Sequence, residues 1–279
     1  MRIRCWGSRG SIPVSGPEYN KYGGETTCIE IRSSRNDVII VDAGSGIRQC
    51  GDRLLKEKVK KVYQLFTHVH YDHTIGFPFF MPAYSRDLSV AVYGVPFEHS
   101  SFKETLHGII QAPYFPVDLL NLPAALTFRD IGAKPFSIGS VSISTIPLNH
   151  PNGGVGYRFQ EGGSTFVFLT DNELSDHRPG TLAFADFVDF CTGADLLIHD
   201  AEFDPREYAH FKGWGHSTYP EVIDLGIAAG VKTLGLFHIN NRRTDKEMDS
   251  MVRNAKALLR KRTTTMQCVG ISNKFEIEI

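Results

Sequence analysis

The chain has 279 residues, and its 30 Lys and Arg side chains nearly balance its 31 Asp and Glu side chains. That length allows a substantial buried core. With this balance the chain has no excess positive charge to attract an anionic membrane or nucleic acid. We therefore expect no membrane association and no structured nucleic acid as partner. The five cysteines form no C-x-x-C pair, which disfavours a disulfide scaffold. With no recognisable signal peptide and no long apolar run, a cytoplasmic protein is expected.

Short β-branched runs recur along the chain and predict strands. They lie at residues 28–32, 38–44, 62–68, 88–94, 140–148, 164–171, 195–203, 233–240 and 274–279. Apolar spacings near 3.6 predict helices after Gly46 and from Glu247, and Thr218 with Glu221 reads as a capping box that opens another helix. Strands cluster first and helices intervene irregularly, which favours an α/β sandwich with helices packed outside two sheets.

We expect a single domain over residues 1–279, because no repeat, low-complexity tract or linker interrupts the chain. The segment from about 81 to 134 is rich in Pro, Phe and Tyr. It could form an irregular insertion that covers a site, or its aromatic side chains could be an ordinary satellite core.

The stretch THVHYDH at residues 67–73 follows a predicted buried strand and carries three imidazoles and a carboxylate. His68 and His70 point the same way if the backbone stays extended, so they can bind one ion together. Asp72 and His73 follow after the chain has begun to turn and can face a second ion. Imidazole and carboxylate ligands without thiolates are typical of an open catalytic site for Zn, Mn or Fe. The alternative is a polar surface loop.

Three further candidate ligands follow other predicted strands, and they are His150, Asp171 and His238. A carboxylate can bridge two cations held roughly 3.5 to 4 Å apart, so Asp171 is the expected bridge.

The order of these motifs resembles that of the metallo-β-lactamase-fold hydrolases, most of all the phosphodiesterase branch that includes transfer-RNA 3'-processing endonucleases and bacterial cyclic-nucleotide phosphodiesterases. The resemblance runs through GSRGSIPVSG, VIIVDAGSG, THVHYDH, LNHPNGGVGYRF, FLTDNE, LLIHDAEF, GHST and LFHIN. It implies an α/β fold, a four-layer αββα sandwich of two mixed β-sheets with helices outside, and two divalent metal ions.

The resemblance also divides the candidate ligands between the two ions. The first ion takes His68, His70 and His150. The second takes Asp72, His73 and His238, and Asp171 lies between the two ions.

Three further residues gain a role by the same resemblance. His216, in GHST, corresponds to a catalytic histidine near the scissile phosphate, and Asp200 stands where an acidic residue orients it, although the family more often has Glu there. Arg242 falls where related enzymes have a phosphate-contacting Arg, but it could equally be a solvated helix-cap residue. No role is assigned to five other histidines, His99, His107, His177, His199 and His210.

The expected chemistry is attack by hydroxide on a phosphodiester. Two cations lower the pKa of a bridging water from 15.7 to about 7 and neutralise the phosphoryl oxygens. Asp72 would hold or deprotonate this nucleophile, and a protonated His216 would donate to the leaving oxygen. The alternative for His216 is a core histidine bonded to Asp200.

The expected substrate is a small phosphodiester, either a cyclic nucleotide or a cyclic phosphate. Residues 151–170 leave room for a hairpin but not for the long arm that transfer-RNA processing enzymes carry between the corresponding positions. Tyr114 and Phe115 could stack on a base or cover the site. The alternatives are a thioester or lactone hydrolase, an RNA 3'-processing nuclease and a non-catalytic metal-binding sensor. Many relatives form dimers, which makes a homodimer a family expectation.

Overall fold

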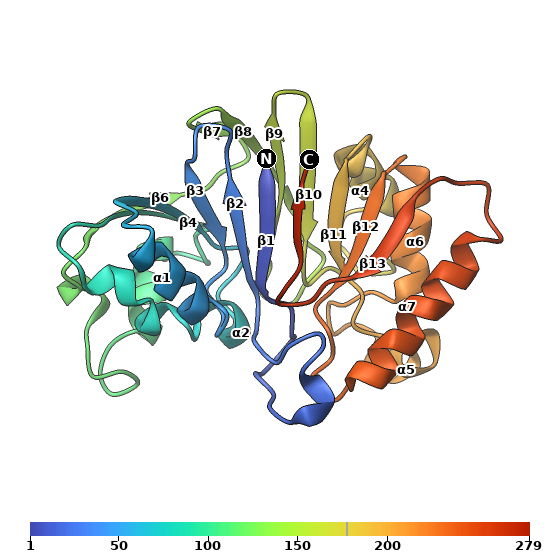
Figure 1. Ribbon diagram of the computed structural model, residues 1–279, viewed down its shortest axis with the longest axis horizontal. Helices are drawn as coiled ribbons and strands as arrows, with labels where there is room; N and C mark the ends of the chain where they lie inside the picture. The colour runs from blue at the N-terminus through green and yellow to red at the C-terminus, as the bar shows by residue number, and fades with distance from the viewer. Residues whose placement is uncertain (177) are drawn as a thin grey trace.

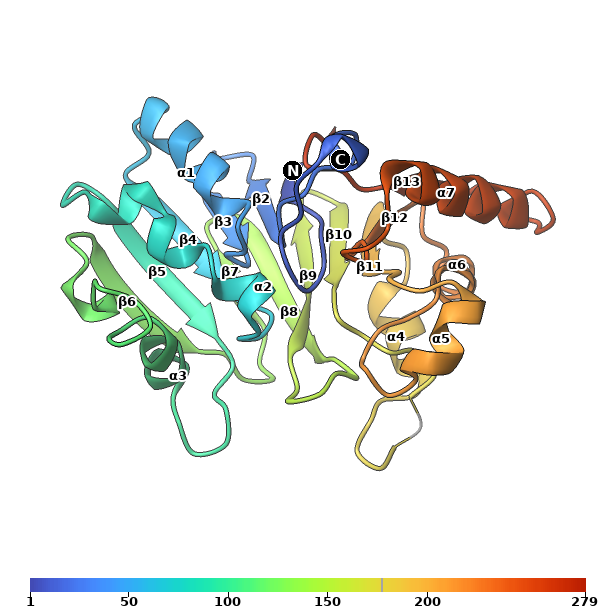
Figure 2. The ribbon, with the colours of Figure 1, turned by 90° about the horizontal axis from the view of Figure 1, so that it is seen from below.

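Two seven-stranded sheets pack face to face in the computed structural model, which describes residues 1–176 and 178–279 (Figure 1). His177 therefore lies outside the described residues. Helices cover the outer face of each sheet, so the layers follow the order helix, sheet, sheet, helix (Figure 2). This arrangement confirms the predicted α/β sandwich of four αββα layers.

The first sheet has the strand order β14-β1-β2-β3-β4-β5-β6. Neighbours from β14 to β3 are antiparallel, whereas β3 to β6 run parallel, so the sheet is mixed. Its strands are β1 (Arg2–Gly7), β2 (Cys28–Arg32), β3 (Val38–Val41), β4 (Lys61–Leu65), β5 (Ser89–Gly94), β6 (Ala125–Asp130) and β14 (Glu276–Glu278).

The second sheet repeats this plan with the order β13-β12-β11-β10-β9-β8-β7. Its parallel strands run from β13 to β10, and its antiparallel neighbours from β10 to β7. Its strands are β7 (Phe136–Ile138), β8 (Val141–Pro147), β9 (Val155–Glu161), β10 (Ser164–Leu169), β11 (Leu196–Asp200), β12 (Thr233–Phe237) and β13 (Gln267–Gly270).

Helices fill the two outer layers and the loops at the strand ends. The α-helices are α1 (Ile47–Lys56), α2 (Tyr71–Thr74), α3 (Phe102–Ile109), α4 (Phe184–Cys191), α5 (Pro205–Phe211), α6 (Tyr219–Ala228) and α7 (Asp245–Leu259). Short 3₁₀ turns are η1 (Pro17–Tyr19), η2 (Phe77–Phe79), η3 (Met81–Tyr84) and η4 (Leu119–Asn121). Helix α6 begins directly after Thr218, whose backbone N–H donates to Glu221 at 2.8 Å, as the capping-box pattern predicts.

Three apolar cores hold the four layers together. One lies between the first sheet and helices α1 and α3, a second lies between the two sheets, and a third lies between the second sheet and helices α4, α6 and α7. Strand β10 contributes to two of these cores, because Phe166 and Phe168 face the first sheet while Val167 and Leu169 face the helices. A strand that is buried on both faces explains the uninterrupted apolar run at this position.

The segment from 81 to 134 is more regular than its composition suggests. Strands β5 and β6 extend the first sheet, and α3 packs on that sheet's outer face. Phe102 and Leu106 of α3 are buried there, in the core between the first sheet and its helices. A site-covering role for the remaining loop stays a prediction.

No helix in the described ranges is long and apolar enough to cross a membrane.

Removing one ring from the core between the sheets should measure how far that core stabilises the fold. Phe168 is fully buried, and its ring centroid lies 5.3 Å from that of Phe237. We expect Phe168→Ala to lower the free energy of unfolding by about 3 to 5 kcal/mol, as measured by urea denaturation. The control is Phe184→Ala on α4, where 37% of the side chain is exposed; an equal loss in both variants would contradict the prediction.

Candidate functional site

The candidate ligands all follow strands, and they meet where the ends of the two sheets come together. The loop after β4 carries His68 and His70, and the short helix α2 carries Asp72 and His73. The second sheet supplies three more ligands directly after its strands, namely His150 after β8, Asp171 after β10 and His238 after β12. Side chains far apart in the sequence therefore become neighbours through the docking of the two halves.

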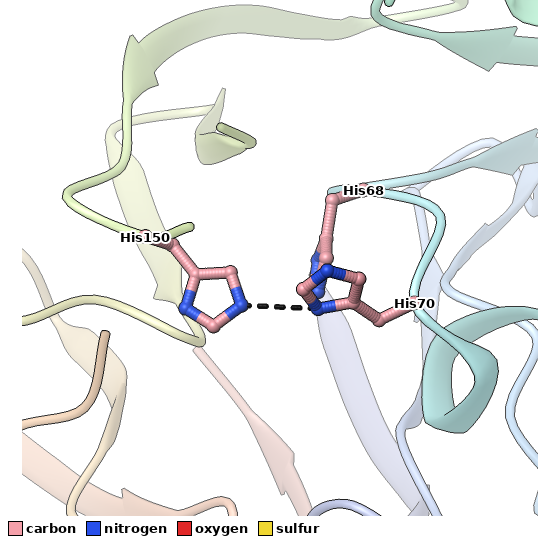
Figure 3. Close-up of side chains that lie close together, drawn as sticks. All are labelled: His68, His70 and His150. Carbon is pink, nitrogen blue, oxygen red and sulfur yellow. Dashed lines mark hydrogen bonds between the residues drawn. The ribbon is translucent and has the colours of Figure 1, made fainter. Parts of the chain in front are cut away.

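His68, His70 and His150 form the first group (Figure 3). Their ligand atoms all lie within 4.8 Å of one another. His150 Nε2 lies 3.1 Å from His70 Nδ1, and the two side chains point toward each other from the two halves of the molecule (Figure 3). This is the set of three imidazoles predicted for the first ion.

Asp72, His73, Asp171 and His238 form the second group. His73 Nε2 and His238 Nε2 lie 3.4 and 3.3 Å from Asp171 Oδ1. The same two nitrogens lie 3.3 and 3.1 Å from Asp72 Oδ2. This group adds two carboxylates to two imidazoles.

Asp171 belongs to both groups through different oxygens. Its Oδ1 faces the second group, whereas its Oδ2 lies 3.7 Å from His68 Nε2 and 3.7 Å from His150 Nε2. This division of the two oxygens is the arrangement required of a carboxylate that bridges two cations.

In four of the imidazoles, a hydrogen bond to Nδ1 fixes the orientation of the ring. His73 Nδ1 donates to Asp42 at 2.8 Å, and His238 Nδ1 donates to Glu202 at 3.0 Å. His68 and His150 use their Nδ1 atoms in the same way, toward Thr67 Oγ1 at 3.0 Å and Gly215 O at 3.1 Å. These bonds select the tautomer that leaves Nε2 free to bind a metal.

The residues fit a pair of divalent cations. His68 Nε2 and His73 Nε2 are buried and have no hydrogen-bond partner among the described residues. Burial lowers the pKa of His68 well below its usual range and that of His150 to about 4, so both rings are neutral and offer lone pairs. Burial would also lower the pKa of His73, but Asp72, Asp171 and Asp42 raise it well above its usual range. The buried carboxylates thus attract positive charge, which bound cations would supply.

Unusual backbone geometry positions several of these side chains. Asp171 and His238 have φ angles of 53° and 54°, in the left-handed region that non-glycine residues rarely adopt. Gly215 has a φ of 89°, and a Cβ placed there would lie 2.1 Å from His150 Nδ1. Only glycine therefore allows the backbone at position 215 to approach the His150 ring so closely.

His216 and Asp200 come together as the sequence predicts. His216 Nδ1 lies 2.7 Å from Asp200 Oδ2, and its ring centroid lies 4.7 Å from that of His238. Its Nε2 lies 3.5 Å from Glu202 Oε2. Burial would lower the pKa of His216, but the carboxylates of Asp200 and Glu202 raise it to about 9.

The three predicted substrate-binding residues lie around two different pockets. Arg242 borders a pocket of about 410 Å³ that also contains His216. Tyr114 and Phe115 border a separate pocket of about 360 Å³, next to Tyr71 of α2. The structure therefore does not bring Arg242 and the two aromatic residues to one surface.

Sequence reasoning missed two carboxylates that orient the ligands. Asp42 directly follows β3, the parallel neighbour of β4, so the shared edge of these strands was an available signal. Glu202 lies two residues after Asp200 in the predicted motif HDAEF, and the side chains of such a pair share a face in extended backbone.

Four other histidines of the described residues stay outside the two groups of candidate ligands. His107 bonds to Asp118 at 3.0 Å, and the buried His199 bonds to the backbone oxygen of Asp200 at 2.7 Å. Neither they nor His99 and His210 join the two groups of ligands.

The fold and this site define a metallo-hydrolase. A family model described as a beta-lactamase superfamily domain matches residues 37–239, and the chain belongs to that superfamily. The ribonuclease Z of Exiguobacterium sibiricum is 27% identical over 228 residues, which are 68% of this chain and 75% of that protein. These findings confirm the family resemblance that the sequence motifs suggest, and the fold of this superfamily implies divalent metal ions.

Solved structures with low sequence identity share the fold. YhfI from Bacillus subtilis, a metallo-beta-lactamase fold protein, has a TM-score of 0.73 at 17% identity, and the alignment covers 100% of this chain and 99% of YhfI. Yeast PDE1 has a TM-score of 0.71 at 14% identity, with 100% of this chain and 99% of PDE1 covered.

Removal of the shared carboxylate should disrupt both metal positions. We expect Asp171→Ala to lose roughly half or more of its bound metal after dialysis, because both ligand groups lose an oxygen. Elemental analysis of protein loaded with Zn or Mn measures this loss. Asp52→Ala on the exposed face of α1 is the control, and an unchanged metal content in Asp171→Ala would contradict the bridging role.

Asp42 should act on metal affinity mainly through His73, which it contacts directly, and also through Thr67, which it holds next to His68. We expect Asp42→Asn to weaken the binding of the most loosely held ion about 10- to 100-fold, because the His73 ring loses the carboxylate that orients it. Competition with a metal chelator measures the affinity. Asp87→Asn, which removes a charge from an exposed pair with Lys60, should change nothing.

Proposed function

We propose that this chain is a metal-dependent phosphoric diester hydrolase that cleaves a small phosphodiester, either a cyclic nucleotide or a cyclic phosphate. The observation that carries the proposal is the position of His216. Asp200 holds its ring beside both groups of ligands, where it can serve the leaving oxygen of a phosphodiester. The ribonuclease Z relatives, whose name denotes cleavage of RNA, support the same bond type.

Two bound divalent ions, Zn, Mn or Fe, would supply an activated water and neutralise the phosphoryl oxygens. The chain's own residues would do the rest. Asp72 Oδ2 accepts a hydrogen bond from the Ser11 backbone N–H at 2.8 Å, which fixes the carboxylate so that it can orient the attacking water and accept its proton. His216 would donate a proton to the leaving oxygen, and Asp200 would keep the ring protonated and oriented.

A small substrate is favoured by the hairpin between β9 and β10. Ser164 pairs with Glu161 across a turn that consists of Gly162 and Gly163 alone. These glycines have φ angles of 58° and 90°, as a tight two-residue turn requires. No RNA-binding arm is present in this hairpin, and the net charge of −1 offers little attraction to a long polyanion.

Two other substrate classes remain as alternatives within the same fold. An RNA 3'-processing activity is favoured by the ribonuclease Z relatives, with which the comparison extends over 84% of this chain in the Lactococcus lactis protein at 24% identity. A thioester or lactone hydrolase would use the same metal ligands but would give His216 no part in the reaction.

Hydrolysis of bis(p-nitrophenyl) phosphate by protein loaded with Mn or Zn tests the bond type. With 3',5'-cyclic AMP, whose leaving oxygen is an alkoxide, we expect His216→Ala to lower kcat by roughly 10²- to 10⁴-fold with the metal content unchanged, since the leaving group loses its proton donor; the loss should be smaller for p-nitrophenolate, which leaves without protonation. His210→Ala, at an exposed position of α5, is the control. Turnover of a thioester or a lactone alone, with no dependence on His216, would overturn the proposal.

The dependence of kcat on pH should reveal how Asp200 affects the pKa of His216. The carboxylates raise the pKa of His216, so the protonated form persists at low pH and is lost as the pH rises through that pKa. Asp200→Asn removes one of these charges and should move the alkaline limb of kcat to lower pH by about one unit or more. Asp52→Asn should leave the limb in place; an unshifted limb in Asp200→Asn would show that His216 is not the titrating acid.

A further inference from the structure

The pocket beside His216 combines three aromatic rings with two polar side chains, Asn241 and Arg242, that make no hydrogen bond or ion pair within the described ranges. Its volume is about 410 Å³, within the usual range for small-molecule sites. Phe203, Phe211 and Trp214 form one side, and Asn241 and Arg242 lie among the residues that complete the lining.

The rings of Phe203, Phe211 and Trp214 follow one another outward from His216. The ring centroid of Phe203 lies 6.0 Å from that of His216, and Phe211 stacks on Phe203 at 5.0 Å with an interplanar angle of 2°. Trp214 meets Phe211 edge to face at 5.2 Å. The last ring is the most accessible one, since 62% of Trp214 is exposed. Its indole is therefore available to a planar ligand.

The loop that carries Trp214 is held in place by a buried carboxylate. Glu173 is only 1% exposed, and it accepts hydrogen bonds from the backbone N–H groups of Gly213 and Gly215, both at 2.8 Å. The Tyr208 hydroxyl donates to the same carboxylate at 2.5 Å. Trp214 lies between the two anchored glycines, so its backbone is fixed before any ligand arrives. A preorganised aromatic surface loses little entropy when a ligand stacks on it.

The polar side of the pocket includes two carboxylates, Glu202 and Glu207, which are paired with His238 and Arg243. Among the described residues, neither the Asn241 side chain nor the Arg242 guanidinium makes a hydrogen bond or an ion pair. Both are therefore free to bind oxygen or nitrogen atoms of a substrate, and a guanidinium is well matched to a phosphoryl group.

The second aromatic pocket offers less for such a ligand. It is lined by Tyr71, Thr74, Ile75, Pro78, Phe79, Ile109, Ile110, Tyr114 and Phe115. No charged side chain belongs to this lining, and none of the candidate metal ligands or His216 does.

We propose that the pocket of Phe203, Phe211, Trp214 and Arg242 is a subsite for the leaving nucleoside of the substrate, with its base stacked on Trp214. This inference rests on the proposed function, because it takes the alcohol that His216 would protonate to be a nucleoside. It narrows the substrate class to phosphodiesters that carry a nucleobase on the leaving side. Aromatic stacking of this kind accepts different bases, because each base has a π-face.

The intrinsic fluorescence of the protein provides a direct readout. The chain has two tryptophans, and Trp6 is buried and bonded to Glu30. We expect adenosine 5'-monophosphate to quench the fluorescence of the metal-loaded protein saturably, and ribose 5-phosphate, which has no base, to leave it unchanged. Trp214→Phe should abolish the quenching while keeping part of the affinity.

Calorimetric titration with the same two probes measures the contribution of the base. Trp214→Ala should weaken binding of adenosine 5'-monophosphate about tenfold and leave that of ribose 5-phosphate unchanged. The matched control is Phe184→Ala, at an exposed aromatic residue of α4 outside both pockets, which should bind both probes as the wild type does. Equal affinities of the two probes, or an equal loss in Phe184→Ala and Trp214→Ala, would overturn the subsite.

The two proposals fail in different ways. If bis(p-nitrophenyl) phosphate is cleaved but Trp214→Ala binds both probes normally, the subsite is wrong and the phosphodiesterase activity stands. If no phosphodiester is cleaved but quenching and its loss in Trp214→Phe occur as expected, the nucleotide subsite stands and the proposed activity is wrong.

Discussion

The buried carboxylate of Asp171 is the group on which the arrangement of the site depends. Both of its oxygens face imidazole nitrogens, yet it lies in a seam that excludes water, where a negative charge without a partner is costly. The surrounding groups can satisfy it only if the two sheets bring His68 and His73 from one half against His150 and His238 from the other. The position of Asp171 thus requires both halves and, within them, the ends of several particular strands.

This requirement couples the site to the docking of the sheets. The first half supplies the ligands of the motif THVHYDH, and the second half supplies His150, Asp171 and His238. Neither half holds a complete group of ligands. Cations that bind only after docking would stabilise the docked state by an amount that grows with the logarithm of their affinity, so metal binding and the packing of the sheets would reinforce each other.

The sequence predicts those parts of the fold that local pattern determines. Buried strands such as β10 and β12 appear as apolar runs, and the candidate ligands that follow them, Asp171 and His238, are visible because a polar side chain ends each run. Strand β6 and helix α3 are not predicted, because β6 is largely exposed at the edge of the sheet and α3 is short. Partners such as Asp42 and Glu202 were also missed: their places after strands were a signal in the sequence, but which imidazole each one orients is settled only by contacts between elements distant in the sequence.

Glu173 accepts hydrogen bonds from the backbone of Gly213 and Gly215, so the loop is fixed on both sides of Trp214. Gly215 contacts His150, and His216 follows directly, whereas the Trp214 side chain lines the pocket with Phe203 and Phe211; the hydrogen bonds to the backbone of Gly213 and Gly215 do not involve the indole. A change of side chain at position 214 would leave the placement of His150 and His216 intact. If Trp214 contacts the substrate as proposed, substitutions at this position could change substrate preference during evolution without displacing His150 or His216.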